Sequence, residues 1–315
     1  MAESYNTLAG LVQFNDKNLA ELDITDLLQD APVLNAMFAQ PASNGTEHKY
    51  LKLTTASSSS FRDALDGITK TASADTLVTD TLAILDGSFD TDVALADAYK
   101  GGRDAWLQRE LVRTMKGIFA NAEGQIFYGV GNDASGFPGL LDNAQLDALA
   151  DTMVIDASGS TASEQTSCYL LRSGRDDVSF ILGNDGNIVV EDDPTVIQKA
   201  GAVSGHYPAL YVPVTGYSGF QIGGAYSAAR IANIDCGTLT STSAFTDDHI
   251  YAALSAFPAS RGPGMICMNR NAQRMLRQSR TAVNATGAAA PLPTEVEGIP
   301  IIVTDQLTST ESVET

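Results

Sequence analysis

The side chains best suited to bind a metal ion or to act as a nucleophile or base are few in this sequence and lie far apart. They are three histidines and three cysteines: His48, His206, His249, Cys168, Cys236 and Cys267. Zinc sites place such residues at short fixed spacings, for example Cys-x-x-Cys. None of the six has a partner at such a spacing. We therefore expect no metal site, no catalytic residue and no cofactor, and free buried thiols in a chain that folds in a reducing cytosol.

Other motifs that carry chemistry are absent or incomplete. The sequence has no Gly-x-Ser-x-Gly elbow and no Walker phosphate loop. Two glycine-rich stretches, 129–136 and 219–230, are interpreted as turns, because neither has the strand-to-helix context of a phosphate-binding loop. The acidic run 86–92 lacks the spacing of a calcium loop and is interpreted as a solvated turn. The sequence leaves open a catalytic triad built from residues far apart in the chain, because a triad is defined by its geometry and not by the order of its residues.

Composition indicates a folded, acidic chain. Of its 315 residues 44% are hydrophobic and 18% charged, and the formal net charge is −19. This charge argues against a dedicated nucleic-acid binder, because clustered Lys and Arg supply the affinity for phosphate. No stretch approaches the 18 consecutive apolar residues of a membrane span, and the N-terminus has no signal-peptide pattern.

The basic residues are concentrated in two short stretches, which hold ten of the nineteen Lys and Arg. One stretch contains Lys100, Arg103, Arg109, Arg113 and Lys116. The other has no Asp or Glu at all and contains Arg261, Arg270, Arg274, Arg277 and Arg280. Two interpretations stay open. These are solvated helix faces, or they meet acidic surfaces of neighbouring copies or a packaged polyanion, in which case assembly should depend on salt.

Apolar periodicity predicts one unusually long helix over residues 95–129. Leu111, Met115, Ile118 and Ala122 recur at steps of three and four and share one face. At 1.5 Å per residue such a helix would be about 50 Å long, more than a domain of this size needs. A structure larger than one subunit should use it.

The sequence of residues 1–90 predicts elements that have no core of their own and must pack on another surface. Residues 1–45 contain only short apolar pieces, which is typical of an arm without its own core. Residues 46–90 predict a ribbon of two strands, 48–53 and 76–85, joined by a long, small and polar tip. Isolated two-stranded ribbons are marginal in water, so this one should lie on another surface. An ordinary surface insertion is the alternative.

The remainder alternates strands and helices. Residues 141–240 are β-rich, with strands expected at 168–171, 178–182, 188–190, 210–214 and 220–222. Residues 241–315 predict a helix at 246–257, a strand at 264–268, a helix at 271–280 and a strand at 299–304. The fold class is therefore α+β.

Taken in order, these pieces resemble the major capsid proteins of tailed bacteriophages, which have the Hong Kong 97 fold. The long helix ending Gln125-Ile-Phe-Tyr-Gly129, followed by Gly136-Phe-Pro-Gly-Leu140, is similar to the family's spine helix and the turn after it. Residues 220–235 are similar to a β segment of one phage subgroup. Residues 268–280, followed by Glu297-Gly-Ile-Pro-Ile-Ile-Val-Thr-Asp305, are similar to the strand, helix and return strand of the axial domain. The resemblance rests on the order in which these segments occur along the chain.

The resemblance implies five regions: an N-terminal arm (1–45), an extended loop (46–90), the spine helix of the peripheral domain (91–140), a β-rich segment (141–240) and an axial domain (241–315). In the type member the β-rich segment would follow the axial helices, so its placement here stays open. The implied partners are further copies in hexamers and pentamers, a separate scaffolding protein, a portal and decoration proteins, but no membrane. Lys49, Lys52 and Lys70 lie in or near the ribbon, and nothing marks one as a covalent crosslinking residue.

The leading hypothesis is therefore a non-enzymatic shell protein of the virion, made in the host cytoplasm. It would self-assemble into an icosahedral head around double-stranded DNA, which it would touch only weakly and non-specifically. Two alternatives remain. One is an encapsulin-like shell that encloses cargo enzymes, and the other is a soluble α/β enzyme with a site assembled from distant residues.

Overall fold

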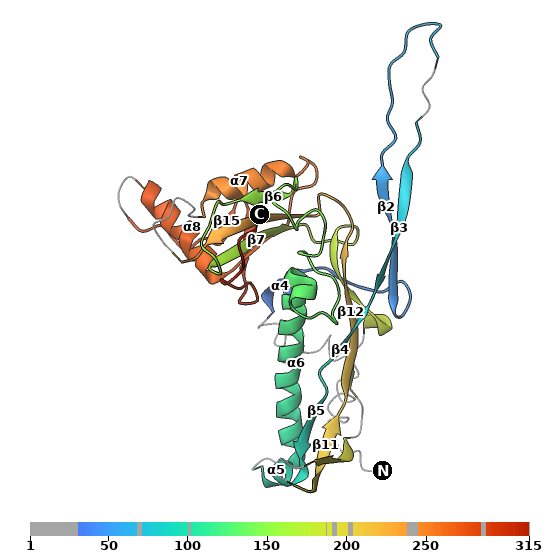
Figure 1. Cartoon of the computed structure of the whole chain (residues 1–315), viewed down its shortest axis with the longest axis vertical. Helices are drawn as coiled ribbons and strands as arrows, with labels where there is room; N and C mark the ends of the chain where they lie inside the picture. Colours follow the sequence, from blue (N-terminus) through green and yellow to red (C-terminus); the bar gives the residue numbers. More distant parts are fainter. Residues whose placement is uncertain are drawn as a thin grey trace.

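The chain forms two bodies that lie side by side, and a long hairpin projects from one of them (Figure 1). The computed structural model describes residues 31–67, 71–99, 102–186, 188–190, 194–200, 204–237, 245–284 and 288–314. We name the part built on helix α6 the long-helix body. The part built on a six-stranded sheet is named the six-stranded body.

Helix α6, Arg103–Tyr128, is the axis of the long-helix body and runs through 26 residues. At 1.5 Å per residue it is about 39 Å long. The expectation of one helix over 95–129 is wrong at its start, because a separate short helix, α5 (Val93–Ala98), precedes it. Gly102 has a φ of 85°, a left-handed conformation that ends any continuous right-handed helix. The rod is therefore shorter than its apolar pattern predicts.

Two sheets lie along α6 (Figure 1). The five-stranded sheet has the order β1-β8-β12-β4, with β9 also paired to β12, and the three-stranded sheet has the order β10-β11-β5. The strands of these sheets are β1 (Ala39–Pro41), β4 (Ala83–Asp86), β5 (Phe89–Asp92), β8 (Val178–Leu182), β9 (Val189–Val190), β10 (Thr195–Ala200), β11 (His206–Val212) and β12 (Val214–Ile222).

The six-stranded body has the sheet order β15-β16-β14-β7-β13-β6. Its helices, α7 (Asp247–Ala256) and α8 (Arg270–Val283), confirm the predicted helices at 246–257 and 271–280. Thr246 and Asn269 are the N-cap residues of α7 and α8. The strands are β6 (Val154–Asp156), β7 (Gln165–Leu171), β13 (Ala228–Asp235), β14 (Met265–Met268), β15 (Glu295–Val296) and β16 (Ile299–Val303).

The β-rich segment 141–240 is divided between the two bodies. Strands β6, β7 and β13 join the six-stranded sheet, whereas β8 to β12 lie beside α6. The chain thus leaves the six-stranded body after β7 and returns to it at β13. Because the segment contributes strands to both bodies, its strand pattern could not assign it to a single domain.

The projecting hairpin consists of β2 (Glu47–Thr55) and β3 (Ala74–Thr81), which are antiparallel with Leu51 opposite Leu77. The predicted ribbon is confirmed here, but its second strand does not run to residue 85. Leu82 is buried and separates β3 from β4. A Cβ added to Gly183 or Gly219 would overlap the Leu82 side chain, so these two glycines make the space that it fills.

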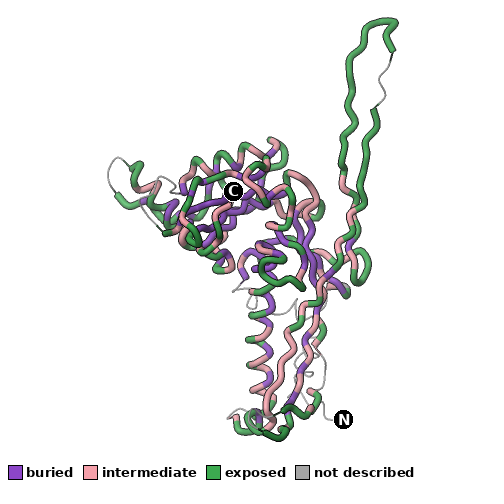
Figure 2. The backbone as a smooth tube through the Cα atoms, viewed as in Figure 1, coloured by how far each residue is buried: buried purple, intermediate pink, exposed green. Residues whose placement is uncertain are grey.

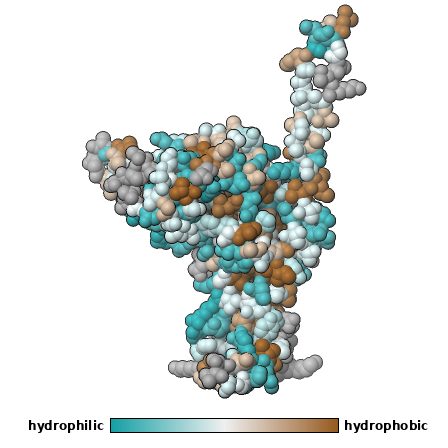
Figure 3. Space-filling view, viewed as in Figure 1, coloured by the Kyte–Doolittle hydropathy of each residue, from teal (hydrophilic) through white to brown (hydrophobic). Residues whose placement is uncertain are grey.

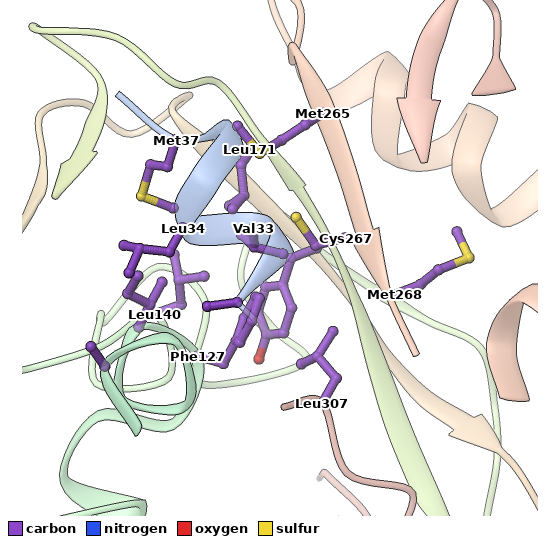
Figure 4. Close-up of a cluster of buried hydrophobic side chains, with 14 of the residues drawn as sticks. Val33, Leu34, Met37, Phe127, Leu140, Leu171, Met265, Cys267, Met268 and Leu307 are labelled. Atoms are coloured by element: carbon purple, nitrogen blue, oxygen red, sulfur yellow. The ribbon is translucent and has the colours of Figure 1, made fainter. Parts of the chain in front are cut away.

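One core joins the two bodies and includes the start of the described chain (Figure 4). Val33 and Leu34 of helix α4 (Pro32–Ala36) are buried against Phe127 of α6 and residues of the six-stranded sheet. Residues 1–30 of the expected arm lie outside the described residues. Within the described part of 1–45, Ala31, Val33, Leu34 and Met37 are buried in this core, whereas Phe38 is 44% exposed.

Candidate assembly surfaces

The six side chains best suited to chemistry do not form a site. No group of three or more His, Cys, Asp or Glu in the described part of the chain could hold a metal ion. Cys168 and Cys267 are buried in the six-stranded sheet, and burial raises the pKa of both thiols. The Cys236 thiol is partly buried, with its pKa raised for the same reason.

The histidines have structural surroundings. His249 belongs to the N-terminal capping box of α7, where burial lowers its pKa. His206 begins β11 opposite Ala200 and is exposed. His48 lies in β2 at the root of the hairpin and is only 8% exposed.

His48 fixes the hairpin root to the five-stranded sheet. Its Nδ1 accepts a hydrogen bond from the Ser43 backbone N–H at 3.2 Å, and its Nε2 lies 2.7 Å from Oε1 of Gln221 in β12. These partners assign the neutral tautomer with the proton on Nε2. Gln221 is itself held, because its Nε2 donates to the Arg175 carbonyl and its Oε1 accepts from Gln40 Nε2. These hydrogen bonds therefore hold the base of the hairpin in a fixed position on the five-stranded sheet.

The two faces of the hairpin differ in burial. The face that carries His48 and Tyr50 turns toward the body, where the Tyr50 hydroxyl donates to the Ile222 carbonyl at 3.3 Å. Asp80 lies opposite His48 in β3, and burial raises the pKa of its carboxyl. Burial and the neighbouring Asp80 charge also raise the pKa of Tyr50.

The other face of the hairpin carries three uncovered leucines, which we name the leucine face: Leu51, Leu53 and Leu77. Leu51 and Leu77 are 70% and 59% exposed although they stand opposite each other in register. The hairpin above its root is exposed along both strands (Figure 2). A groove of about 700 Å³ runs beside it, between Leu51, β1 and Arg175. Clustered apolar residues of this kind mark protein contacts.

The hairpin tip carries two large apolar side chains, in contrast to the expectation of a small and polar tip. Phe61 and Leu65 are fully exposed, and the tip is partly brown in the hydropathy view (Figure 3). The surrounding serines give the stretch a polar average, which hides both residues. Their large apolar side chains among small polar residues are the only signal in the sequence that marks them.

The basic stretch of α6 is largely paired within the chain. Arg103 makes two hydrogen bonds to Asp97, and Arg113 donates to Glu110 at 2.9 Å. The Arg109 guanidinium lies 5.3 Å from the Trp106 ring centre. Lys100 lies outside the described residues.

The basic stretch of α8 is less paired. Arg280 donates to both carboxylate oxygens of Asp247, at 2.7 and 2.8 Å. Arg277 donates through Nε to the Ala290 carbonyl. Within the described ranges, Arg261, Arg270 and Arg274 have no carboxylate within ion-pair distance.

The acidic run 86–92 is not a solvated turn, because it contains strand β5, which pairs with β11. Asp86 accepts from the Ser88 N–H and hydroxyl, and Asp90 pairs with Lys199. Asp92 caps α5. These carboxylates point to different partners, so no calcium loop forms.

The glycine-rich stretch after α6 is the turn that was predicted. Gly129 has a φ of 49° and ends the helix. Asp142 Oδ2 accepts hydrogen bonds from the N–H groups of Val130 and Gly139, both at 2.9 Å. Gln125 Nε2 donates to the Phe137 carbonyl at 2.8 Å. The turn is thus tied closely to the helix end.

Two buried carboxylate-containing clusters join distant segments. Glu123 of α6 accepts hydrogen bonds from the N–H groups of Val33 and Leu34 and from the Thr304 hydroxyl. Burial raises the pKa of this carboxyl. The second cluster joins Arg230 of β13 to Glu311 and Glu314 near the end of the chain.

These features define the class of the protein. A long helix flanked by extended sheets, a second sheet body and a hairpin with an uncovered apolar face describe a subunit of a protein shell. No helix in the described ranges is long and apolar enough to cross a membrane.

Comparison with known proteins identifies the family. Residues 16–314 match the family described as major capsid protein GP7, and the chain belongs to that family. It is therefore a structural protein of a phage capsid and not an enzyme. No curated protein is similar enough to this chain to match it.

Two solved phage structures show the same fold. Bacteriophage Epsilon15 has a structure with 20% sequence identity and a TM-score of 0.65, covering 88% of each chain. The bacteriophage JBD30 capsid has 9% identity and a TM-score of 0.50, covering 95% of this chain and 98% of that one. The SrpI encapsulin of Synechococcus elongatus has 11% identity and a TM-score of 0.46, covering 67% and 90%. The fold is the capsid fold of the Hong Kong 97 type.

Proposed function

We propose that this chain assembles through hexamers and pentamers into a closed icosahedral head that encloses double-stranded DNA. The observation that carries the proposal is the leucine face. Among the described residues, Leu51, Leu53 and Leu77 project from a fixed root into solvent and have no cover, which a neighbouring molecule would supply. In a shell, the neighbouring subunit supplies this cover through a heterologous contact that repeats until the surface closes.

The two bodies correspond in this proposal to the two domains of a capsid subunit. The long-helix body is the peripheral domain. The six-stranded body, which gathers β6, β7 and β13 with residues 245–314, is the axial domain around the symmetry axes. A scaffolding protein, a portal and decoration proteins would be separate chains.

The net charge of −19 supports weak contact with the packaged DNA. An inner wall that bound phosphate strongly would hinder packing and release. We therefore expect only non-specific contact between the shell and DNA.

Electron microscopy and sedimentation of the purified full chain test this proposal. Closed particles of megadalton mass are expected, and infected-cell particles should contain DNA. Small oligomers only, at every concentration tested, would contradict a shell function. Particles that hold protein cargo and no nucleic acid would support the encapsulin-like alternative instead.

A further inference from the structure

The outer edge of strand β2 is unpaired above the root of the hairpin. Among the described strands β2 pairs only with β3, so this two-stranded sheet has two free edges. Antiparallel strands alternate hydrogen-bonded with non-hydrogen-bonded pairs, and in the second kind the backbone N–H and C=O groups point away from the partner strand. The contacts at the root therefore show which residues of β2 have outward backbone groups.

The odd-numbered residues of β2 are the ones that point outward. The Lys49 N–H donates to the Ser43 hydroxyl at 2.8 Å, so it faces away from β3. The register with β3 runs without a break from Glu47 to Leu53. The alternation therefore also turns the N–H and C=O groups of Leu51 and Leu53 outward. In the described ranges no other residue hydrogen-bonds to these groups.

The neighbouring edge strand, β1, is protected where β2 is open. The Phe38 carbonyl and the Ala42 N–H bond to β8, which leaves the backbone groups of Ala39 and Pro41 pointing outward. Proline has no N–H, and its presence in an edge strand prevents further pairing. Strand β2 contains no proline. Of these two strands, β2 is therefore the one whose edge can accept a further strand.

A groove beside β2 leaves room for such a strand. Its volume of about 700 Å³ is typical of pockets that enclose a whole small molecule. Lys49 and Leu51 of β2 and Ala39 and Pro41 of β1 are among the residues that line it, and no residue of β3 does. The free space thus lies on the β2 side of the hairpin. The hairpin above it is exposed along both strands (Figure 2).

We propose that an extended strand of a second copy adds to the outer edge of β2 and hydrogen-bonds to Leu51 and Leu53. The added strand converts the two-stranded ribbon, which is marginal alone, into a three-stranded sheet. Alternate side chains of this strand stand about 5 Å from the two leucines on the same face. The inference rests on the proposed shell function and adds to it the backbone groups that hold the neighbour in place.

A second copy is the partner because the chain belongs to a family of capsid proteins, which assemble from many copies of one subunit. The edge of β2 also adjoins the leucine face, which the proposed function assigns to contact with a neighbouring copy. One neighbour therefore covers both. Because strand addition uses backbone groups, the partner segment needs only an extended conformation and apolar side chains at alternate positions.

Proline substitution in the full chain tests the backbone contact. Leu51→Pro and Leu51→Ala both remove the leucine side chain, but only the proline also removes the outward N–H. Leu77→Pro and Leu77→Ala are the matched controls, because Leu77 stands opposite Leu51 and its own N–H lies on the outer edge of β3. Thermal denaturation verifies that each unassembled variant folds. Sedimentation measures the protein concentration needed for assembly.

Leu51→Pro should need a concentration about three- to tenfold higher than Leu51→Ala, which corresponds to the loss of one hydrogen bond at each contact. The two Leu77 variants should differ by less than about twofold. The melting temperatures of the two unassembled Leu51 variants should agree closely, because this N–H has no partner within the subunit. Equal assembly of the two Leu51 variants, or an equally large difference between the two Leu77 variants, would overturn the contact.

Amide hydrogen exchange of the wild-type chain tests the same contact without any substitution. The outward amides within residues 50–55 should exchange at least about tenfold more slowly in particles assembled from the purified chain than in the unassembled chain. Equal exchange in the two states would overturn the contact.

Two further results of the exchange experiment would also overturn it. Slow exchange already in the unassembled chain would mean that the chain covers its own edge. Slow exchange only in particles from infected cells would assign the strand to another protein. Absence of particles from the wild type would instead contradict the shell function itself, whereas normal particles with unprotected amides would contradict only the strand addition.

Discussion

Arg230 of β13 and Glu314 near the end of the chain form an ion pair across the six-stranded body, with Nη1 and Oε2 2.9 Å apart. Arg230 is buried, and its Nε donates to the Ser167 hydroxyl at 3.1 Å. The terminal segment therefore supplies the countercharge that a strand in the middle of the chain needs. Glu311 in the same segment also accepts from the Tyr128 hydroxyl of α6, so the segment ties both bodies together.

Deletion of residues 311–315 should lower the free energy of unfolding by about 3–5 kcal/mol, because it leaves the Arg230 charge buried and unpaired. Urea denaturation of the unassembled chain measures this loss. Adding Arg230→Met to the truncated chain should recover part of it, since the charge is then absent. An equal loss with and without Arg230 would show that the pair does not carry the effect.

Glu123→Gln should change stability in a pH-dependent way. Burial raises the pKa of Glu123 in the folded chain, so the folded state holds the proton to higher pH than the unfolded state does. Its contribution to stability is complete below the ordinary glutamate pKa and is lost as the pH rises through the raised value. The glutamine variant does not titrate there. Its stability relative to the wild type should therefore increase with pH across this window and level off above it.

Denaturation of both chains at several pH values between about 4 and 8 measures this difference. Glu123→Ala is the control. It leaves the N–H groups of Val33 and Leu34 without an acceptor, at a cost of about 1–3 kcal/mol for each buried group. A wild-type advantage over the glutamine variant that grew with pH would contradict the assignment.

The turn after α6 should be sensitive at Gly129. Alanine there must adopt a φ of 49°, and its Cβ would overlap Asp142 Oδ2. A loss of about 2 kcal/mol or more in unfolding free energy is expected. Asp142→Asn keeps an acceptor oxygen and should cost less than Asp142→Ala. Equal stability of all three variants, measured by thermal denaturation, would mean that this cap does not hold the helix end.

The leucine face should matter for assembly and not for the fold of the subunit. Leu51→Ser with Leu77→Ser should leave the melting temperature of the unassembled chain nearly unchanged, because both side chains are exposed there. The concentration needed for assembly should rise at least about tenfold, since apolar burial is lost at every contact. Thr79→Ser, on the same face, is the control. A large drop in the subunit's own melting temperature would place the leucines in its core.

Several elements could be predicted from sequence because their signals are local. The apolar stripe from Leu111 to Ile126 predicts α6, and the cap at Thr246 marks the start of α7. The alternation in β2 predicts the hairpin. The shared order of such pieces also supported the capsid resemblance, which the family match confirms.

Other features depend on contacts between distant residues and could not be predicted. The end of β3 is set by Leu82, which fills the space beside Gly183 and Gly219 more than 100 positions away. The burial of Val33 and Leu34 depends on Glu123 as an acceptor. The separation of α5 from α6 had a local signal, the glycine pair 101–102, which the strong periodicity around it outweighed.

Accessibility of residue 51 before and after assembly tests the central claim most directly. Leu51→Cys in a Cys236→Ser background offers one exposed thiol, because Cys168 and Cys267 are buried. A maleimide should label this thiol rapidly in the unassembled chain and at least about tenfold more slowly in closed particles, because the leucine face is then covered by another copy. Equal labelling rates in the two states would contradict the claim that this face finds its cover on a neighbouring subunit.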